Sequence, residues 1–129
     1  MDIETLIKKD LFASYVGIEL LSAANGKAVA KLDLKKCHRN GVGMVHGGAI
    51  FTLADLAFAA AANSHDHLAV AMNVSITFMK ATKGATLFAE ATEISQNKRV
   101  ASYTVIVKDE INETIAIFQG LAYKKAYQK

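Results

Sequence analysis

The stretch from Ile50 to Ala62 constrains this chain more than any other, because it is thirteen residues of nearly unbroken apolar sequence. Its length and its content of Ala and Leu favour a helix over a strand. Apolar residues occupy almost every azimuth of that helix, so we expect it to be covered on all sides at the centre of the fold. Asp55 is the only ionisable residue in it, and a carboxylate there must be paired, protonated or functional.

Composition excludes several classes of protein. The 129 residues are 52% hydrophobic, which suits one folded domain, residues 1–129, with a continuous core. No apolar run approaches the roughly 20 residues that span a bilayer, so we expect no membrane partner. The net charge of +3 comes from scattered Lys and Arg, a pattern that disfavours nucleic acid as a partner. The single Cys37 cannot form an intramolecular disulfide and indicates a reducing, cytoplasmic location.

The segments before the central helix read as one short helix and two strands. Asp2 to Phe12 has apolar residues at helical spacing, with Asp2 as its N-cap. Tyr15 to Ser22 and Lys27 to Leu34 are predicted strands, and the Asn25-Gly26 pair between them is a strong hairpin signal.

The segments after the central helix read as strands alone. Turn residues separate four runs, which together predict an antiparallel meander: Leu68 to Met79, Thr86 to Ile94, Val100 to Lys108 and Thr114 to Tyr123. We therefore predict an α+β fold in which an antiparallel sheet of about six strands wraps around one long helix. Such a sheet still has edges and the helix an open side, so we expect an obligate dimer.

A second motif precedes the helix: Asn40 and the triplet His46-Gly47-Gly48. Together with Leu53-Ala54-Asp55, Asn63-Ser64 and the strand residues Ile76-Thr77-Phe78-Met79, it resembles the hotdog-fold acyl-CoA thioesterases, and most closely their phenylacetate-pathway (PaaI-like) branch. The resemblance covers nearly the whole chain. It implies a homo-oligomer, a dimer or a dimer of dimers, that hydrolyses an acyl-CoA without a cofactor other than the coenzyme A of the substrate.

The resemblance also implies roles for four residues. The N–H of Gly47 would bind the thioester carbonyl, helped by the side-chain amide of Asn40, while His46 would shape the turn. Asp55 matches the family's carboxylate, which acts as general base or as nucleophile. The chain departs from its relatives at Ala71, where they often carry a hydroxyl; the nearest polar groups are Asn73 and Ser75. It also has Lys80-Ala81 where many relatives have a proline.

Helix geometry adds a constraint on Gly47 and Asp55. Eight residues separate them, or about 12 Å along one helix axis, yet both must reach one reacting centre about 3 Å away. Two antiparallel helices can satisfy this where one cannot. The shared site of the family has that form, with Gly47 and Asn40 from one subunit and Asp55 from the other.

Further residues are candidates for substrate binding. An apolar wall for the acyl group would draw on Gly48 and the larger residues Met44, Val45, Phe51, Leu56, Phe58 and Phe78. The phosphates of coenzyme A would meet some of the basic residues Lys80, Lys83, Lys98 and Arg99. We expect no metal, because nothing completes a site around His65-Asp66-His67.

Three alternatives remain open at this point. Asp55 would be a structural carboxylate if a neighbouring group bonded to it. A hotdog hydratase or dehydratase would require His46 in proton transfer. A non-catalytic acyl-CoA binding module would bind the ester and release no thiol. The acyl group itself, aryl or medium-chain, is not fixed by the sequence.

Overall fold

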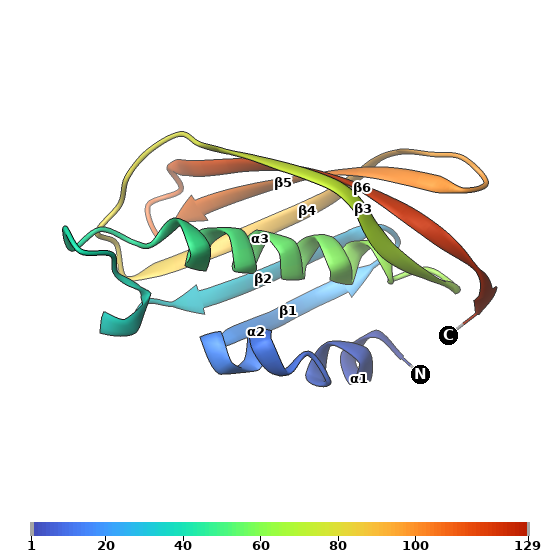
Figure 1. Cartoon of the computed structure of the whole chain (residues 1–129), viewed down its shortest axis with the longest axis horizontal. Coiled ribbons are helices and arrows are strands. Elements are labelled where there is room, and N and C mark those ends of the chain that lie inside the picture. Colours follow the sequence, from blue (N-terminus) through green and yellow to red (C-terminus); the bar gives the residue numbers. More distant parts are fainter. Residues whose placement is uncertain (1, 129) are drawn as a thin grey trace.

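The computed structural model describes residues 2–128, and its centre is helix α3 (Gly47–Ala62), which lies across one face of a six-stranded antiparallel sheet (Figure 1). The strands are β1 (Ile18–Ala24), β2 (Lys27–Asp33), β3 (His67–Phe78), β4 (Thr86–Gln96), β5 (Val100–Asp109) and β6 (Thr114–Gln128). The expected sheet around one long helix is confirmed. No helix within these residues is long and apolar enough to cross a bilayer.

The N-terminal segment corrects the prediction of one helix followed by a strand from Tyr15. It forms two short helices, α1 (Ile3–Lys8) and α2 (Leu11–Val16). Asp10 breaks the helical run, because its carboxylate accepts a hydrogen bond from the N–H of Ala13 and caps α2. Gly17, with φ of 101°, ends α2 in the left-handed conformation, so β1 begins at Ile18.

The strand order corrects the predicted four-strand meander. The strands run β1-β2-β4-β5-β6-β3, so β4, β5 and β6 form a meander but β3 pairs with β6 at the far edge. The connection 79–85 carries the chain back across the end of the sheet, held by hydrogen bonds from Val45 N–H to Thr82 O and from Leu34 N–H to Ala85 O. Three strand spacings are about 14 Å, well within the reach of seven residues.

The hairpin between β1 and β2 is confirmed. Asn25 and Gly26 both have positive φ, 52° and 80°, as a two-residue hairpin loop of the favoured twist requires. The strands pair from Ala24 opposite Lys27 outward.

The core lies between α3 and the inward-facing residues of the sheet. Phe58 is central to it, because its ring lies 5.6 Å from the ring of Tyr103 and 5.7 Å from that of Phe118, measured between centroids. Gly120 leaves room for this ring, since a Cβ there would come within 2.7 Å of it. The helix is covered on all but one side: a stripe of Gly48, Thr52, Asp55 and Ala59 stays partly exposed.

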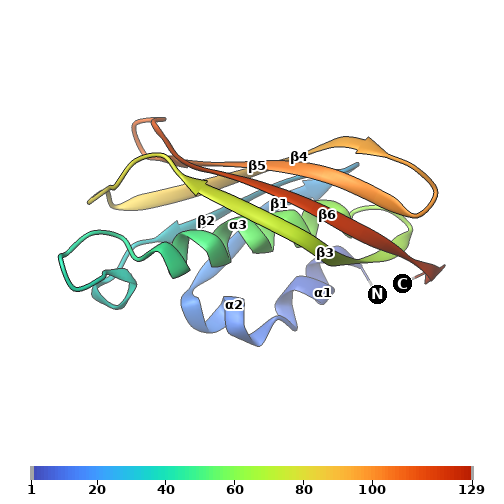
Figure 2. The same ribbon diagram turned by 45° about the horizontal axis from the view of Figure 1, so that its top comes forward.

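The two edges of the sheet differ. Strand β1 is short, has a bulge between Leu20 and Ser22, and lies beside α1 and α2 (Figure 2). Strand β3 has twelve residues, no helix lies along its free side, and Val70, Met72 and Phe78 on it are exposed apolar residues. Edge strands are normally shortened, bulged or covered, so β3 is the edge that the fold leaves open for pairing.

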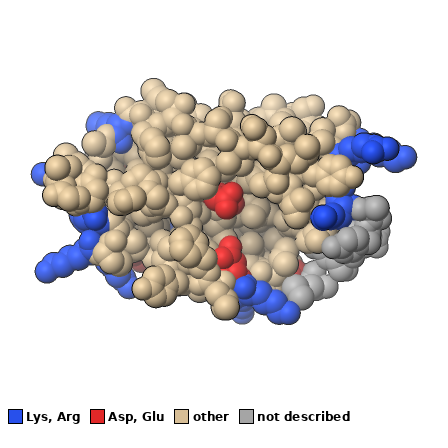
Figure 3. Space-filling view, in the orientation of Figure 1, with Lys and Arg blue, Asp and Glu red and all other residues tan. Residues whose placement is uncertain are grey.

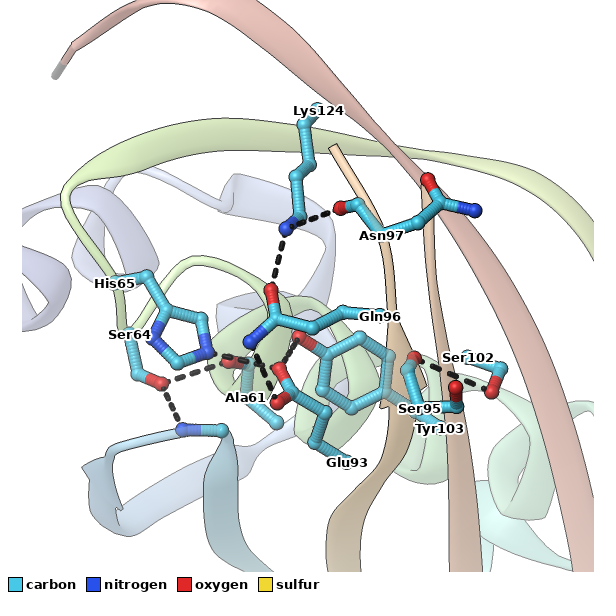
Figure 4. A network of polar contacts seen from close by, with 11 residues as sticks. Ala61, Ser64, His65, Glu93, Ser95, Gln96, Asn97, Ser102, Tyr103 and Lys124 are labelled. Carbon is cyan, nitrogen blue, oxygen red and sulfur yellow. Dashed lines mark hydrogen bonds and ion pairs between the residues drawn. The ribbon is translucent and has the colours of Figure 1, made fainter. Parts of the chain in front are cut away.

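The C-terminal end of α3 is fastened to the sheet by a polar network (Figure 4). Ser64 Oγ accepts a hydrogen bond of 2.7 Å from Gly26 N–H. Glu93 accepts one of 2.8 Å from the hydroxyl of Tyr103 and lies 2.8 Å from His65 Nε2. Burial opposes ionisation of Glu93, but the hydrogen bonds from His65 and Tyr103 outweigh it and lower the pKa of the carboxyl.

Candidate active site

The triplet His46-Gly47-Gly48 forms the N-terminus of α3, and each residue has a distinct part in it. His46 is the N-cap, and its Nδ1 accepts a hydrogen bond of 2.8 Å from Gly48 N–H. Gly48 has to be glycine, because a Cβ there would lie 2.9 Å from that nitrogen. The N–H of Gly47 donates to nothing in residues 2–128, so it is free to bind a ligand at the positive end of the helix dipole.

Phe78, at the end of β3, lies against the free N–H group. A Cβ on Gly47 would come within 3.2 Å of the Phe78 ring, so glycine keeps this approach open. The Phe78 side chain is 52% exposed, and it therefore forms a wall of the site on the surface and is not part of the core.

Asn40 organises the loop that leads into this turn. Its Oδ1 accepts hydrogen bonds of 3.1 Å from the N–H groups of Val42 and Met44. Its amide NH2 donates to no residue that the structure describes. The side chain thus holds the loop with its oxygen and keeps a donor available with its nitrogen.

Asp55 lies on the open stripe of α3, two turns beyond Gly47. It is half-buried, and its carboxylate has no hydrogen-bond or ion-pair partner among the described residues, so the structural alternative lacks the bond it requires. Burial raises the pKa of the Asp55 carboxyl, and the charge of Asp10 at the start of α2 raises it further. In Figure 3 the helix side presents acidic groups near the middle of an otherwise uncharged surface, with Lys and Arg toward its ends.

A hollow of about 220 Å³ opens beside Asp55, between α3 and strands β3 and β6. Its other lining residues are all apolar: Phe58, Ala59, Ala62, Ala69, Val70, Ala71 and Ala122. The hollow exists because five of these side chains are single methyl groups. Ala71, where relatives often carry a hydroxyl, is thus placed next to Asp55 as the resemblance implies.

The apolar residues suggested for an acyl wall divide between the core and the surface. Three of them are buried: Val45, Leu56 and Phe58. Met44 and Phe51 are half-buried, and Phe51 packs its ring edge on that of Phe118 at 5.5 Å. Of this set, Phe58 alone lines the hollow beside Asp55.

Asn73 and Ser75 lie on the other face of the sheet from Asp55. Asn73 is opposite Leu121 and Ser75 is opposite Gln119, all on the face turned away from α3. The register shifts between Ala71 and Asn73, and this bulge turns Ala71 inward and Asn73 outward. The structure therefore does not bring these two polar residues to Asp55 within one chain.

The basic candidates lie in turns at opposite ends of the sheet. Lys80 pairs with Glu113, which reduces its availability for a phosphate. Lys83 is on the same β3–β4 connection and Lys98 and Arg99 are on the β4–β5 turn; no ion pair of theirs is found within the described chain. Residues 2–128 contain no group of three or more His, Cys, Asp or Glu that could hold a metal ion.

The structure adds residues to the site that the sequence did not single out. Asp10 acts on the Asp55 carboxyl from a separate helix, and no local pattern signals that contact. Thr52 lies on the same stripe, its hydroxyl donating to Gly48 O at 2.7 Å. The alanines of the hollow could have been found only as the small residues flanking Asp55 at helical spacing, Ala59 and Ala62.

Comparison with known proteins gives a consistent result. The family model described as the thioesterase superfamily matches residues 42–116. The acyl-coenzyme A thioesterase PaaI of Escherichia coli is 33% identical over 120 residues, which are 92% of this chain and 86% of that protein. A candidate esterase of Archaeoglobus fulgidus is 42% identical over 120 residues, which are 92% of this chain and 78% of that protein.

The fold comparison agrees with the sequence comparison. The solved structure of the Escherichia coli PaaI protein from the phenylacetic acid degradation operon superposes with a TM-score of 0.93 at 30% identity. The superposition covers 98% of this chain and 93% of that one. The hotdog architecture expected from the sequence is therefore confirmed.

Proposed function

Because the chain belongs to the thioesterase superfamily and to its PaaI-like branch, we propose that it hydrolyses acyl-CoA thioesters to a free carboxylic acid and coenzyme A. One observation carries the assignment of the site. Helix α3 holds a free N–H at Gly47 and, two turns later, a half-buried carboxylate at Asp55 that has no partner within the described residues. Thioester hydrolysis needs this pair of groups, a donor for the developing oxyanion and a base or nucleophile.

The chemistry assigns each group a step. With Asp55 as base, its carboxylate takes a proton from water while the water oxygen bonds to the thioester carbon. The carbonyl oxygen becomes an oxyanion and accepts hydrogen bonds from Gly47 N–H and from the Asn40 amide. The carbon–sulfur bond then breaks, and the CoA thiolate receives the proton from Asp55. With Asp55 as nucleophile, its oxygen attacks first and water hydrolyses the resulting anhydride.

We propose that the working site is shared between two copies of the chain. Gly47 and Asp55 are about 12 Å apart along α3, too far for both to act on one carbonyl. Pairing through the open edge of β3 places the two copies of α3 antiparallel about a two-fold axis. Gly47 and Asn40 of one copy then approach Asp55 of the other, in a dimer or a dimer of dimers.

We propose that the coenzyme A part of the substrate meets basic residues from both copies. Lys83 and Arg99 lie at opposite ends of one chain, and antiparallel pairing brings opposite ends of neighbouring copies together. The site would need no metal and no cofactor beyond the coenzyme A of the substrate. The exposed free thiol of Cys37 fits the reducing cytoplasm, where we place the reaction.

The experiment that tests this proposal combines a thiol-release assay with complementation. Wild type should release CoA from at least one member of an acyl-CoA panel, whereas Asp55→Asn and Gly47→Val chains should each be inactive. Mixed chains should form heterodimers with one intact site and regain part of the activity. Confirmed heterodimers that stay inactive would refute the shared site, and no release from any acyl-CoA would refute the hydrolase.

The binding of His46 argues against a hydratase. Its Nδ1 is committed to Gly48 N–H as the helix cap, which is a structural part of the turn and not a position from which it exchanges protons with a substrate.

A further inference from the structure

We infer that the hollow beside Asp55 holds the acyl group and restricts it to an unsubstituted hydrocarbon about the size of one aromatic ring. This rests on the proposed function, because it takes the thioester carbon to lie at Asp55. The hollow begins at that carboxylate and extends along α3 toward its C-terminal end, bounded by Ala59 and Ala62.

The size of the hollow sets the upper limit. Its volume is about 220 Å³. A cavity of about 150 Å³ with apolar walls is enough to bind benzene. The hollow therefore accepts a ring on a short linker, or a short aliphatic chain, and excludes a long fatty acyl chain.

The floor of the hollow keeps this size fixed. Phe58 forms it, and the rings of Tyr103 and Phe118 hold Phe58 from two sides. Gly120 lets the Phe58 ring lie deep, since a Cβ there would come within 2.7 Å of the ring. The depth of the hollow is thus set by packing in the core and is the same before and after a substrate binds.

The chemistry of the walls sets the polarity of the acyl group. Asp55 is the only polar side chain that lines the hollow, and the reaction requires it at the thioester. A hydroxyl on the ring would find no side-chain partner there and would lose its hydrogen bonds to water. Apolar pockets disfavour an added hydroxyl by at most about 10²-fold, so we expect phenylacetyl-CoA to exceed 4-hydroxyphenylacetyl-CoA in kcat/KM by about 10-fold or more.

Two substitutions on different elements test the size limit. Ala59→Leu on α3 and Ala71→Val on β3 both fill the hollow with a residue suited to its element. Each should lower the ratio of kcat/KM for phenylacetyl-CoA over acetyl-CoA by at least about 10-fold, the value of one or more methylenes in an apolar pocket. Ala24→Val, at an exposed position on β1, is the matched control and should leave the ratio unchanged. An unchanged ratio in both filled variants would overturn the inference.

A crystal structure of Asp55→Asn protein with phenylacetyl-CoA tests the location independently of turnover. The ring should lie in contact with Ala59, Ala69 and Ala71. A ring found elsewhere, or no binding of phenylacetyl-CoA, would overturn the inference even if thiol release is observed. The proposed hydrolase fails on a different result, namely no thiol release by wild type from any acyl-CoA.

Discussion

The Asp55→Asn substitution separates a catalytic carboxylate from a structural one, because the two predict opposite changes in stability. If Asp55 is base or nucleophile, the amide cannot replace it and turnover should fall by at least about 10²-fold. The cost in stability is set by what the carboxylate contacts. It has no hydrogen-bond partner in residues 2–128, so no buried donor is left unpaired by the change. The usual penalty of about 1–3 kcal/mol for such a loss therefore does not arise, and the variant should be as stable as wild type or more stable.

The pH dependence of stability gives the sign. Burial raises the pKa of Asp55 in the folded protein above its unfolded value, and the charge of Asp10 adds to this. The stability that a protonated Asp55 contributes is fully present below its unfolded pKa of about 4 and is lost as pH rises through the folded pKa. Asparagine does not titrate. The advantage of Asp55→Asn over wild type should therefore grow as pH rises from about 4 through that window and stay level above it.

The assay is urea unfolding at a series of pH values, at one protomer concentration, beside thiol release at pH 7. Fixed concentration is needed because the stability of an obligate dimer depends on it. A variant that loses about 1–3 kcal/mol of unfolding free energy at neutral pH, with activity falling only as it unfolds, would establish the structural reading and refute the reasoning given above.

Three further predictions concern neighbouring groups. Asn40→Asp keeps the oxygen that holds the loop but loses the amide donor, so turnover in a thiol-release assay should fall about 10-fold or more while loop amide signals in NMR stay in place; wild-type turnover would leave Asn40 with a loop role alone. Asp10→Asn keeps the N-cap of α2 and removes a negative charge near Asp55, so the acid limb of the pH–rate profile should move to lower pH; a limb that does not move would mean that Asp55 is not the titrating group. Tyr103→Phe removes a hydrogen bond to ionised Glu93 and should cost about 1.5–3 kcal/mol in urea unfolding at pH 7; because its hydrogen bonds lower the pKa of Glu93, that loss should shrink on acidification through the ordinary carboxyl range, and a loss independent of pH would contradict the pairing.

The parts of the fold that local pattern encodes were predictable. The central helix follows from thirteen apolar residues with one carboxylate, and the β1–β2 hairpin follows from Asn25-Gly26. The partner of β3 was not predictable, because its alternation says which face a residue occupies and nothing about which strand lies beside it. The N-terminal helices misled for a different reason. Leu11 and Tyr15 are apolar yet 78% and 90% exposed, so hydrophobic spacing gave no sign of where α2 begins and ends.

The site shows the same division. The motif around Gly47 places the free N–H at a helix start, which glycine and helix geometry alone require. The faces of β3 could not be read from the sequence, since one bulge after Ala71 reverses the alternation for Asn73 and Ser75. A bulge leaves no signature in residue type, so polar residues two apart from Ala71 seemed to share its face.

The unequal edges of the sheet also determine how far the protein can assemble. Strand β3 offers one set of unpaired backbone groups, and α1 and α2 lie along the other edge at β1. A building block with a single adhesive end joins one other and stops, so edge pairing closes at two copies. A chain from which residues 1–17 were deleted would have two such ends. Each addition would then leave a fresh end exposed, and growth would continue as an open ribbon limited only by supply of protein. The two short helices therefore act as a chain terminator for the sheet.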